Sequence, residues 1–167
     1  MESTVKLVDP ANDEYLAGLE RKGGHENRFF RAMANKPEAL KNFVPFYHSV
    51  MTAGSVDRRI KELVYLAVSY VNECPYCISA HTATGAKAGI SDEEMRAVQT
   101  EQDHSFTPHE RTALQYAREL TRTCDVEDVS DELNKLFSDE QLVELTLIVA
   151  LANFTNRFNN GLGLKPE

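Results

Sequence analysis

Apolar residues recur at intervals of three and four along the middle of the chain, which is the spacing of one face of an α-helix. The clearest run follows Asp57, a residue suited to cap a helix start. Its apolar positions are Ile60, Leu63, Val64, Ala67, Val68 and Val71. With Leu66 and Tyr70 added, this segment is apolar on nearly all of its sides, so it is predicted to be a central, buried helix.

Capping boxes mark three further helix starts. In this pattern a Ser or Thr and a Glu or Gln three residues later satisfy each other's unpaired backbone N–H groups. The pairs are Ser91 with Glu94, Thr107 with Glu110, and Ser138 with Gln141. The last pair leads into an apolar helix from Asp139 to about Asn159, which Gly161 and Gly163 are expected to end.

Another helix is predicted to start at Pro37, and Pro45 is expected to kink or split it. No alternating strand pattern, internal repeat or long linker interrupts the helical segments. A chain of 167 residues, 42% of them apolar, is long enough to bury a substantial core. We therefore predict a single all-α domain over residues 1–167, with a motif-bearing core at about 37–100.

Charge and hydropathy exclude several classes of partner. The net charge of −8 argues against nucleic acid, because phosphate binding needs a basic surface. The longest uncharged apolar run, Leu145 to Asn156, is too short to span a bilayer, and the acidic start does not resemble a secretion signal. Three cysteines are too few for a disulfide scaffold. We expect a soluble cytoplasmic protein without nucleic-acid or membrane partners.

Two of the three cysteines form a Cys-x-x-Cys pair, Cys74-Pro75-Tyr76-Cys77. Pro75 favours a helix start directly after Cys74, and the positive end of a helix favours a thiolate. Cys77 and His81 are four residues apart, so a helix places both on one face. This arrangement predicts thiol chemistry, because the thiolate is the attacking species and a second sulfur can close onto an oxidised first one.

Cysteine pairs with this spacing also occur in other kinds of site. A zinc site needs about four converging ligands, and His25, His48, His104 and His109 lack ligand spacing. Covalent haem attachment needs a histidine directly after the second cysteine, where Ile78 stands. The pair also resembles a glutaredoxin site, but that fold needs flanking strands. The remaining alternative is two small cysteines packed in a core. We expect no metal and no bound cofactor.

Glu62, Cys74-Pro-Tyr-Cys77, His81 and Gly89 together resemble the signature of the alkylhydroperoxidase D-like (AhpD-like) branch of the carboxymuconolactone decarboxylase superfamily. The resemblance is strongest over about residues 57–90. It implies an all-α fold, homo-oligomers (trimers or hexamers) and reduction of a small hydroperoxide by the cysteine pair. It also implies that an external dithiol, such as a lipoyl group, restores the reduced pair.

By this resemblance Cys77 is the peroxidatic cysteine, Cys74 resolves it, and His81 with Glu62 forms the proton relay. Two points conflict with it. Helix-dipole reasoning favours Cys74 as the more reactive thiol. Glu62 lies 12 residues before Cys74, roughly 18 Å along a straight helix, so it reaches the site only if the helices cross or bend.

Tyr76 stands where the best-known peroxidase members carry a histidine, and a tyrosine is a poor base at neutral pH. It is a candidate for lining the substrate entrance, together with Tyr70 and Phe46, against the alternative of ordinary packing. Phe43 and Tyr47 are further candidates for an apolar pocket wall. Cys124 is interpreted as structural. Asn153, Asn156 and Arg157 are interpreted as an oligomer contact or a cap over the site.

The sequence therefore predicts a thiol-dependent peroxidase or dithiol-disulfide oxidoreductase. Two alternatives stay open: a carboxymuconolactone decarboxylase-like enzyme on the same scaffold, and a non-catalytic redox-sensing protein.

Overall fold

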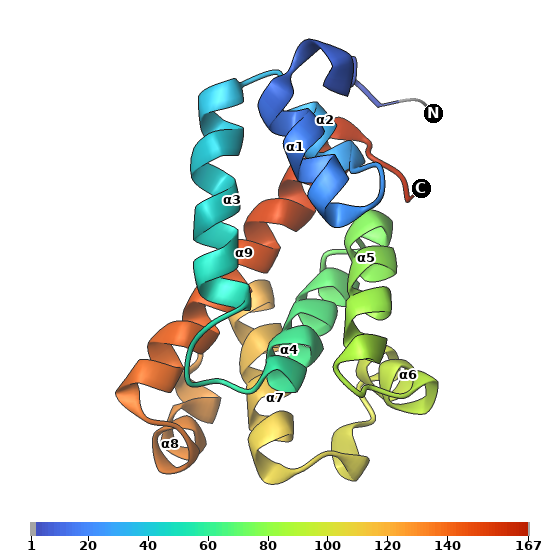
Figure 1. Ribbon diagram of the computed structural model, residues 1–167. Helices are drawn as coiled ribbons and strands as arrows, with labels where there is room; N and C mark the ends of the chain where they lie inside the picture. The colour runs from blue at the N-terminus through green and yellow to red at the C-terminus, as the bar shows by residue number, and fades with distance from the viewer. Residues whose placement is uncertain (1–2, 167) are drawn as a thin grey trace.

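The fold is described from a computed structural model that covers residues 3–166. Those residues form helices joined by short loops and contain no strand, which confirms the all-α prediction (Figure 1). The helices are α1 (Glu14–Gly23), α2 (Arg28–Met33), α3 (Pro37–Met51), α4 (Arg58–Val71), α5 (Pro75–Lys87), α6 (Asp92–Thr100), α7 (Pro108–Thr123), α8 (Glu127–Leu136) and α9 (Asp139–Leu162). Short 3-10 turns occupy Pro10–Asn12 and Asp103–Ser105.

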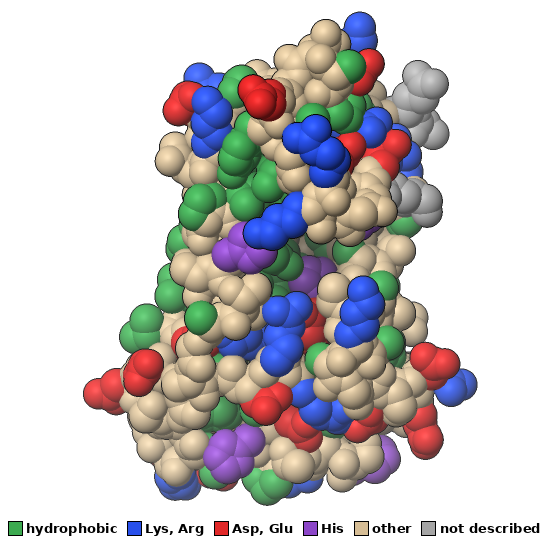
Figure 2. All heavy atoms as spheres, viewed as in Figure 1, with side chains coloured by type: hydrophobic (Ala, Val, Ile, Leu, Met, Phe, Trp, Pro, Cys, Tyr) green, Lys and Arg blue, Asp and Glu red, His purple; other side chains and the backbone are tan. Residues whose placement is uncertain are grey.

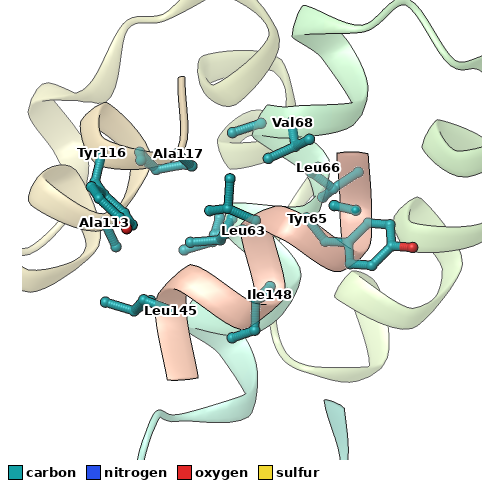
Figure 3. Close-up of a cluster of buried hydrophobic side chains, with 14 of the residues drawn as sticks. Leu63, Tyr65, Leu66, Val68, Ala113, Tyr116, Ala117, Leu145 and Ile148 are labelled. Atoms are coloured by element: carbon teal, nitrogen blue, oxygen red, sulfur yellow. The ribbon is translucent and has the colours of Figure 1, made fainter. Parts of the chain in front are cut away.

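Helix α4 is the centre of the fold, as its all-round apolar pattern predicts. It packs against α5, α7 and α9, and every side chain from Lys61 to Ser69 is buried. Figure 3 shows Leu63 between α7 and α9, next to Ala117 and Ile148, while Tyr65 extends to the other side of α4. Burying one large apolar side chain contributes about 1.5–3 kcal/mol, so this helix organises the core.

The helix starts form as the capping residues predict. The Asp57 side chain accepts the backbone N–H of Arg59 and begins α4. All three capping boxes have both of their hydrogen bonds, at the starts of α6, α7 and α9. These bonds involve residues within one turn, so they depend little on the rest of the fold.

Two boundaries differ from the prediction. Pro45 does not split α3, which continues to Met51. Pro45 and Lys41 are both exposed, so water can bond the Lys41 carbonyl that loses its N–H partner. Gly161 lies inside α9, and only Gly163, with φ of 66°, takes the left-handed conformation that ends the helix.

The ends of the chain form a second apolar cluster beside the main core. It joins α1 and α2 to the end of α9 through residues such as Leu16, Phe29 and Leu164. In Figure 1 these segments lie above the start of α5. Phe43 and Tyr76 pack against both clusters, so the start of α5 lies between the core and the N-terminal helices.

The loop between α3 and α4 is held by a buried ion pair. Lys61 pairs with Glu144 of α9 and donates to the Val50 carbonyl at 2.7 Å. Glu144 Oε2 accepts the backbone N–H groups of Ser55 at 2.8 Å and Val56 at 3.0 Å. The loop therefore depends on α9 for its backbone hydrogen bonds.

Within the described part of the chain, no helix is both long and apolar enough to cross a membrane.

Candidate functional site

The turn between α4 and α5 brings the predicted site residues together. Glu73 has a positive φ of 49°, and the Cys74 N–H bonds the Ser69 carbonyl at 3.0 Å. This tight reversal lays α5 back along α4. Glu62 and His81, on either side of the turn, are thereby placed within 2.7 Å of each other. The 12 residues from Glu62 to Cys74, roughly 18 Å along a straight helix, therefore do not keep Glu62 from the site, because the returning helix α5 brings His81 to it.

The two cysteines lie side by side at the start of α5. Cys74 is the N-cap, and its sulfur accepts the Cys77 N–H at 3.3 Å. Its thiol also donates to Cys77 Sγ at 2.7 Å. Cys74 is fully buried and Cys77 is 3% exposed, and both are free thiols. One sulfur is therefore in direct contact with the other, as an exchange between them requires.

The contacts assign different acidities to the two sulfurs. The hydrogen bond from Cys74 lowers the pKa of Cys77 against the opposing effect of burial, and Asn159, Asn156 and Thr155 lower it further. The same hydrogen bond to Cys77, with burial, raises the pKa of Cys74 far above its ordinary value. Cys77 is therefore the more acidic of the two thiols, and these contacts outweigh the dipole argument that favoured Cys74.

Asn159 of α9 is a direct contact of Cys77 that the sequence reasoning missed. Its Nδ2 donates to Cys77 Sγ at 3.1 Å, across 82 positions of sequence. Thr155 and Asn156 are buried nearby on the same helix. The sequence pattern that could have pointed to Asn159 is the polar group Thr155-Asn156-x-x-Asn159 within an otherwise apolar helix. For Asn156 the sequence predicts only a cap over the site or an oligomer contact.

Glu62 and His81 form a buried hydrogen-bonded pair. Glu62 Oε2 accepts from His81 Nδ1 and from the Thr84 hydroxyl, each at 2.7 Å, and Arg58 lies 2.5 Å from the other oxygen. Burial alone would raise the pKa of Glu62. The hydrogen bond and charge of His81, the Thr84 hydroxyl and the Arg58 charge together hold it below its ordinary value. Glu62 is therefore an ionised carboxylate that keeps the proton of His81 on Nδ1.

The His81 ring stacks on Tyr65, with centroids 3.5 Å apart and planes 14° apart. The hydroxyl of Tyr65 is bonded in turn to Thr155. Within residues 3–166 no hydrogen bond joins Cys77 to His81, although the two lie one helical turn apart. The shortest contacts to the Cys77 sulfur come from Cys74 and Asn159.

The three predicted substrate-lining residues separate in space. The Tyr76 hydroxyl accepts the Phe29 N–H at 3.2 Å, which ties the Cys-x-x-Cys segment to α2. Tyr70 lines a recess with Val98 and Arg118, on the side of α4 that faces α6 and α7. Phe46 is 46% exposed. Of the three, only Tyr76 adjoins the cysteines.

Tyr47 of α3 is a second aromatic residue, besides Tyr65, that is electrostatically linked to the site. Burial raises the pKa of its hydroxyl, and the nearby charges of Glu62 and Cys77 raise it further. Figure 2 shows a hollow on this face of the molecule, between α3 and α5, where hydrophobic and histidine side chains gather. Tyr47 is a half-buried residue of α3 that packs against the main core.

The remaining candidates lie around the site. Asn72, in the α4–α5 turn, donates to the amide oxygens of Asn153 and Asn156, each at 3.0 Å. Arg157 contacts Asn153. Cys124 is exposed and caps the end of α7. Among residues 3–166, no group of three or more His, Cys, Asp or Glu side chains is arranged to hold a metal ion.

Comparison of sequences places this site in a known family. The carboxymuconolactone decarboxylase family matches residues 37–119. The uncharacterized protein YdfG of Bacillus subtilis (strain 168) is 30% identical over 132 residues, covering 76% of this chain and 88% of that protein. The uncharacterized protein YnjA of Escherichia coli (strain K12) is 26% identical over 132 residues, covering 73% and 72%.

Solved structures share the fold across the whole chain. An alkylhydroperoxidase AhpD core, from an uncharacterized peroxidase-related protein of Ralstonia eutropha JMP134, aligns with a TM-score of 0.88 at 21% identity, covering 100% of this chain and 93% of that one. The debrominase Bmp8, solved with 2,3,4-tribromopyrrole, aligns with a TM-score of 0.86 at 19% identity, with the same coverage. The helical fold is thus AhpD-like, and the chain belongs to the carboxymuconolactone decarboxylase family.

Proposed function

We propose that the protein is a thiol-dependent peroxidase that reduces small hydroperoxides with the Cys74–Cys77 pair. The observation that carries this proposal is the direct contact between the two buried sulfurs, in which the hydrogen bond from Cys74 lowers the pKa of Cys77. The thiolate attacks the hydroxyl-bearing oxygen of the hydroperoxide. The S–O bond forms, the O–O bond breaks, and the leaving alkoxide takes a proton to become an alcohol.

The second half of the cycle closes the disulfide. The Cys74 sulfur attacks the Cys77 sulfenic acid, the thiol proton leaves with the hydroxyl as water, and a Cys74–Cys77 disulfide forms. An external dithiol, such as a lipoyl group, then reduces the disulfide and leaves as its own cyclic disulfide. A reducing compartment such as the cytoplasm supplies such donors. The protein itself holds no cofactor in this scheme.

His81 and Glu62 supply the proton relay. Since Glu62 holds Nδ1 in its protonated form, Nε2 of His81 is the nitrogen that exchanges protons with the thiol. No hydrogen bond joins His81 to Cys77, so the transfer passes through a water molecule or a small shift of the ring. Tyr76 and Tyr47 are the aromatic side chains that border the reacting sulfurs in this proposal.

The test is hydroperoxide consumption with a dithiol donor, for the parent protein and three cysteine variants. Cys77→Ser should abolish consumption. Cys74→Ser should leave a sulfenic acid that dimedone traps, as read by mass spectrometry. Cys124→Ser, at an exposed position outside the site, should behave as the parent. Unchanged consumption by Cys77→Ser would overturn the mechanism.

The alternatives have separate readouts in the same experiment. A decarboxylase on this scaffold would turn over a carboxymuconolactone in the Cys74→Ser/Cys77→Ser variant. A redox sensor would form the disulfide once without turning over dithiol. Debromination, the activity named for Bmp8, would release bromide from a bromopyrrole while forming the same disulfide.

A further inference from the structure

Asn159 is buried against the reactive sulfur with half of its amide unused. The side chain is 2% exposed, and its Nδ2 donates to Cys77 Sγ at 3.1 Å. Its Oδ1 has no hydrogen-bond partner among residues 3–166. The neighbouring Asn156 differs, since its Nδ2 donates to Ser69 and its Oδ1 accepts from Asn72. A buried amide oxygen without a donor is costly and calls for an explanation.

The orientation of this amide follows from the charge of Cys77. A thiolate accepts hydrogen bonds, so the NH₂ end of Asn159 faces it, and Cys74 donates from another side. Turning the amide over would place oxygen against the thiolate and lose the hydrogen bond. Covalent geometry then fixes Oδ1 next to the same sulfur. The site therefore presents an unpaired acceptor beside its nucleophile.

We propose that Asn159 is a catalytic residue that binds the O–H group of the oxidant, and that the site is thereby specific for hydroperoxides with a free hydroxyl. This inference rests on the proposed peroxidase function. The hydroperoxide O–H donates to Oδ1 while Nδ2 holds the thiolate. The hydroxyl-bearing oxygen, the one that is attacked, is then positioned at the sulfur.

The same hydrogen bond survives the reaction. When the S–O bond forms and the O–O bond breaks, the hydrogen stays on the transferred oxygen, which becomes the sulfenic acid Cys77–S–O–H. The alkoxide departs with the bonding electron pair and is protonated by water. Oδ1 therefore contacts the same O–H in substrate and product, and no proton passes through Asn159. Its role is orientation of the reacting oxygen.

The test compares two reagents that differ in the O–H group. tert-Butyl hydroperoxide carries one, and methyl methanethiosulfonate, a small thiol reagent, carries none. Rate constants for the Cys77 thiolate are measured with both reagents in the full-length Cys74→Ser/Cys124→Ser protein, with and without Asn159→Leu. The Cys77 pKa of each of these proteins, from thiolate absorbance, corrects its rates for the thiolate fraction, and the protein without Asn159→Leu is the parent of this comparison.

Loss of Nδ2 should raise the Cys77 pKa by about one unit or more, because one hydrogen bond to a charged group is lost. After correction, the methyl methanethiosulfonate rate should stay within about twofold of the parent, while the hydroperoxide rate falls about tenfold or more. Asn160→Leu, at an exposed neighbour that donates to the Asn72 carbonyl, is the matched control and should change neither corrected rate. Asn159→Ala replaces Asn159→Leu if thermal melting shows that the larger side chain disturbs the fold.

If Asn159→Leu lowers the corrected rates with both reagents equally, or lowers neither, the role of Oδ1 is overturned while the peroxidase proposal stays in place. An unchanged pKa would overturn the thiolate contact. A parent protein that is inert toward hydroperoxide but reacts with methyl methanethiosulfonate would overturn the proposed function, and the O–H specificity with it. The outcomes are therefore distinguishable.

Discussion

The acidity of Cys77 depends on side chains from two segments that are distant in sequence. The largest contribution is the hydrogen bond from Cys74, three residues away, and α9 supplies the contact from Asn159. The first is encoded by the Cys-x-x-Cys spacing. The second was not predictable, because no local pattern shows which turn of α9 meets α5.

The pH profile of Cys77 provides a test at this scale. Because its pKa is lowered, alkylation of Cys77 by iodoacetamide should reach half of its maximal rate below pH 9, the ordinary thiol value, and should fall as the pH drops through the folded pKa. Cys74→Ser weakens the largest stabilising contact, so it should shift the profile upward. Cys124→Ser should not shift it. A profile that is the same in Cys74→Ser and the parent would contradict the assigned hydrogen bond.

Glu62 is a buried carboxylate whose partners keep it ionised. Replacing it by Gln leaves Arg58 and His81 without their anion, so Glu62→Gln should lower the free energy of unfolding by about 3 kcal/mol at pH 7. The folded pKa of Glu62 is lowered, so its contribution is complete above the unfolded value near 4.5 and is lost as the pH falls through the folded pKa.

Urea denaturation of Glu62→Gln and the parent at several pH values measures this difference. The gap should be widest near neutral pH and narrow in acid. Glu38→Gln is the control, because Glu38 is an exposed partner of Lys41 and should change stability by less than about 0.5 kcal/mol. If the difference in free energy of unfolding between Glu62→Gln and the parent does not depend on pH, Glu62 is not ionised in the folded protein.

At the scale of the elements, short sequence patterns predicted where helices begin, but they did not predict which helices contact each other. Asp57, Ser91 and Thr107 begin helices as predicted, since a cap is satisfied within one turn. Pro45 was predicted to kink or split its helix, and α3 is not split, since both Pro45 and the residue whose carbonyl loses its N–H partner are exposed to water. The approach of Glu62 to His81 depends on the α4–α5 reversal, which spacing along the chain does not show.

The α3–α4 loop offers a test of how α9 supports an element far away in sequence. Gly54 has φ of 123°, and a Cβ there would collide with the Glu144 carboxylate that pairs with Lys61. Gly54→Ala should therefore lower the free energy of unfolding by about 2 kcal/mol, from backbone strain and displacement of Glu144.

Gly18→Ala is the matched control, because Gly18 lies within α1 and an added Cβ meets no atom within 4 Å. It should stabilise the protein by about 0.5–1 kcal/mol, the gain typical of Gly to Ala in a helix. Urea denaturation measures both variants. If Gly54→Ala is as stable as the parent, Glu144 does not hold the loop as described.

On the scale of the whole molecule, one face remains apolar and exposed. Val143 is 61%, Leu147 39% and Phe154 50% exposed, and their spacing of four and seven places them along one side of α9. Phe46 of α3, 46% exposed, adds to the exposed apolar residues. Phe43, three residues before Phe46 on α3, stacks on Phe154 at 5.7 Å, so α3 and α9 are adjacent here. We propose that this face meets a second copy of the chain in the expected homo-oligomer.

Sedimentation velocity tests this proposal. The parent should sediment as an oligomer, and Leu147→Asp should shift it toward the monomer, because a charge at a buried apolar contact is costly. Thr100→Asp, at an exposed position on α6, should not change the distribution. A parent that sediments as a monomer would contradict the proposal.

The family match ends at residue 119, whereas the amide that contacts the Cys77 sulfur stands at residue 159. The Cys-x-x-Cys motif and one of the contacts that lower the pKa of Cys77 therefore lie in different parts of the chain. A substitution at Asn159 should change the acidity of Cys77 without altering any residue of the motif.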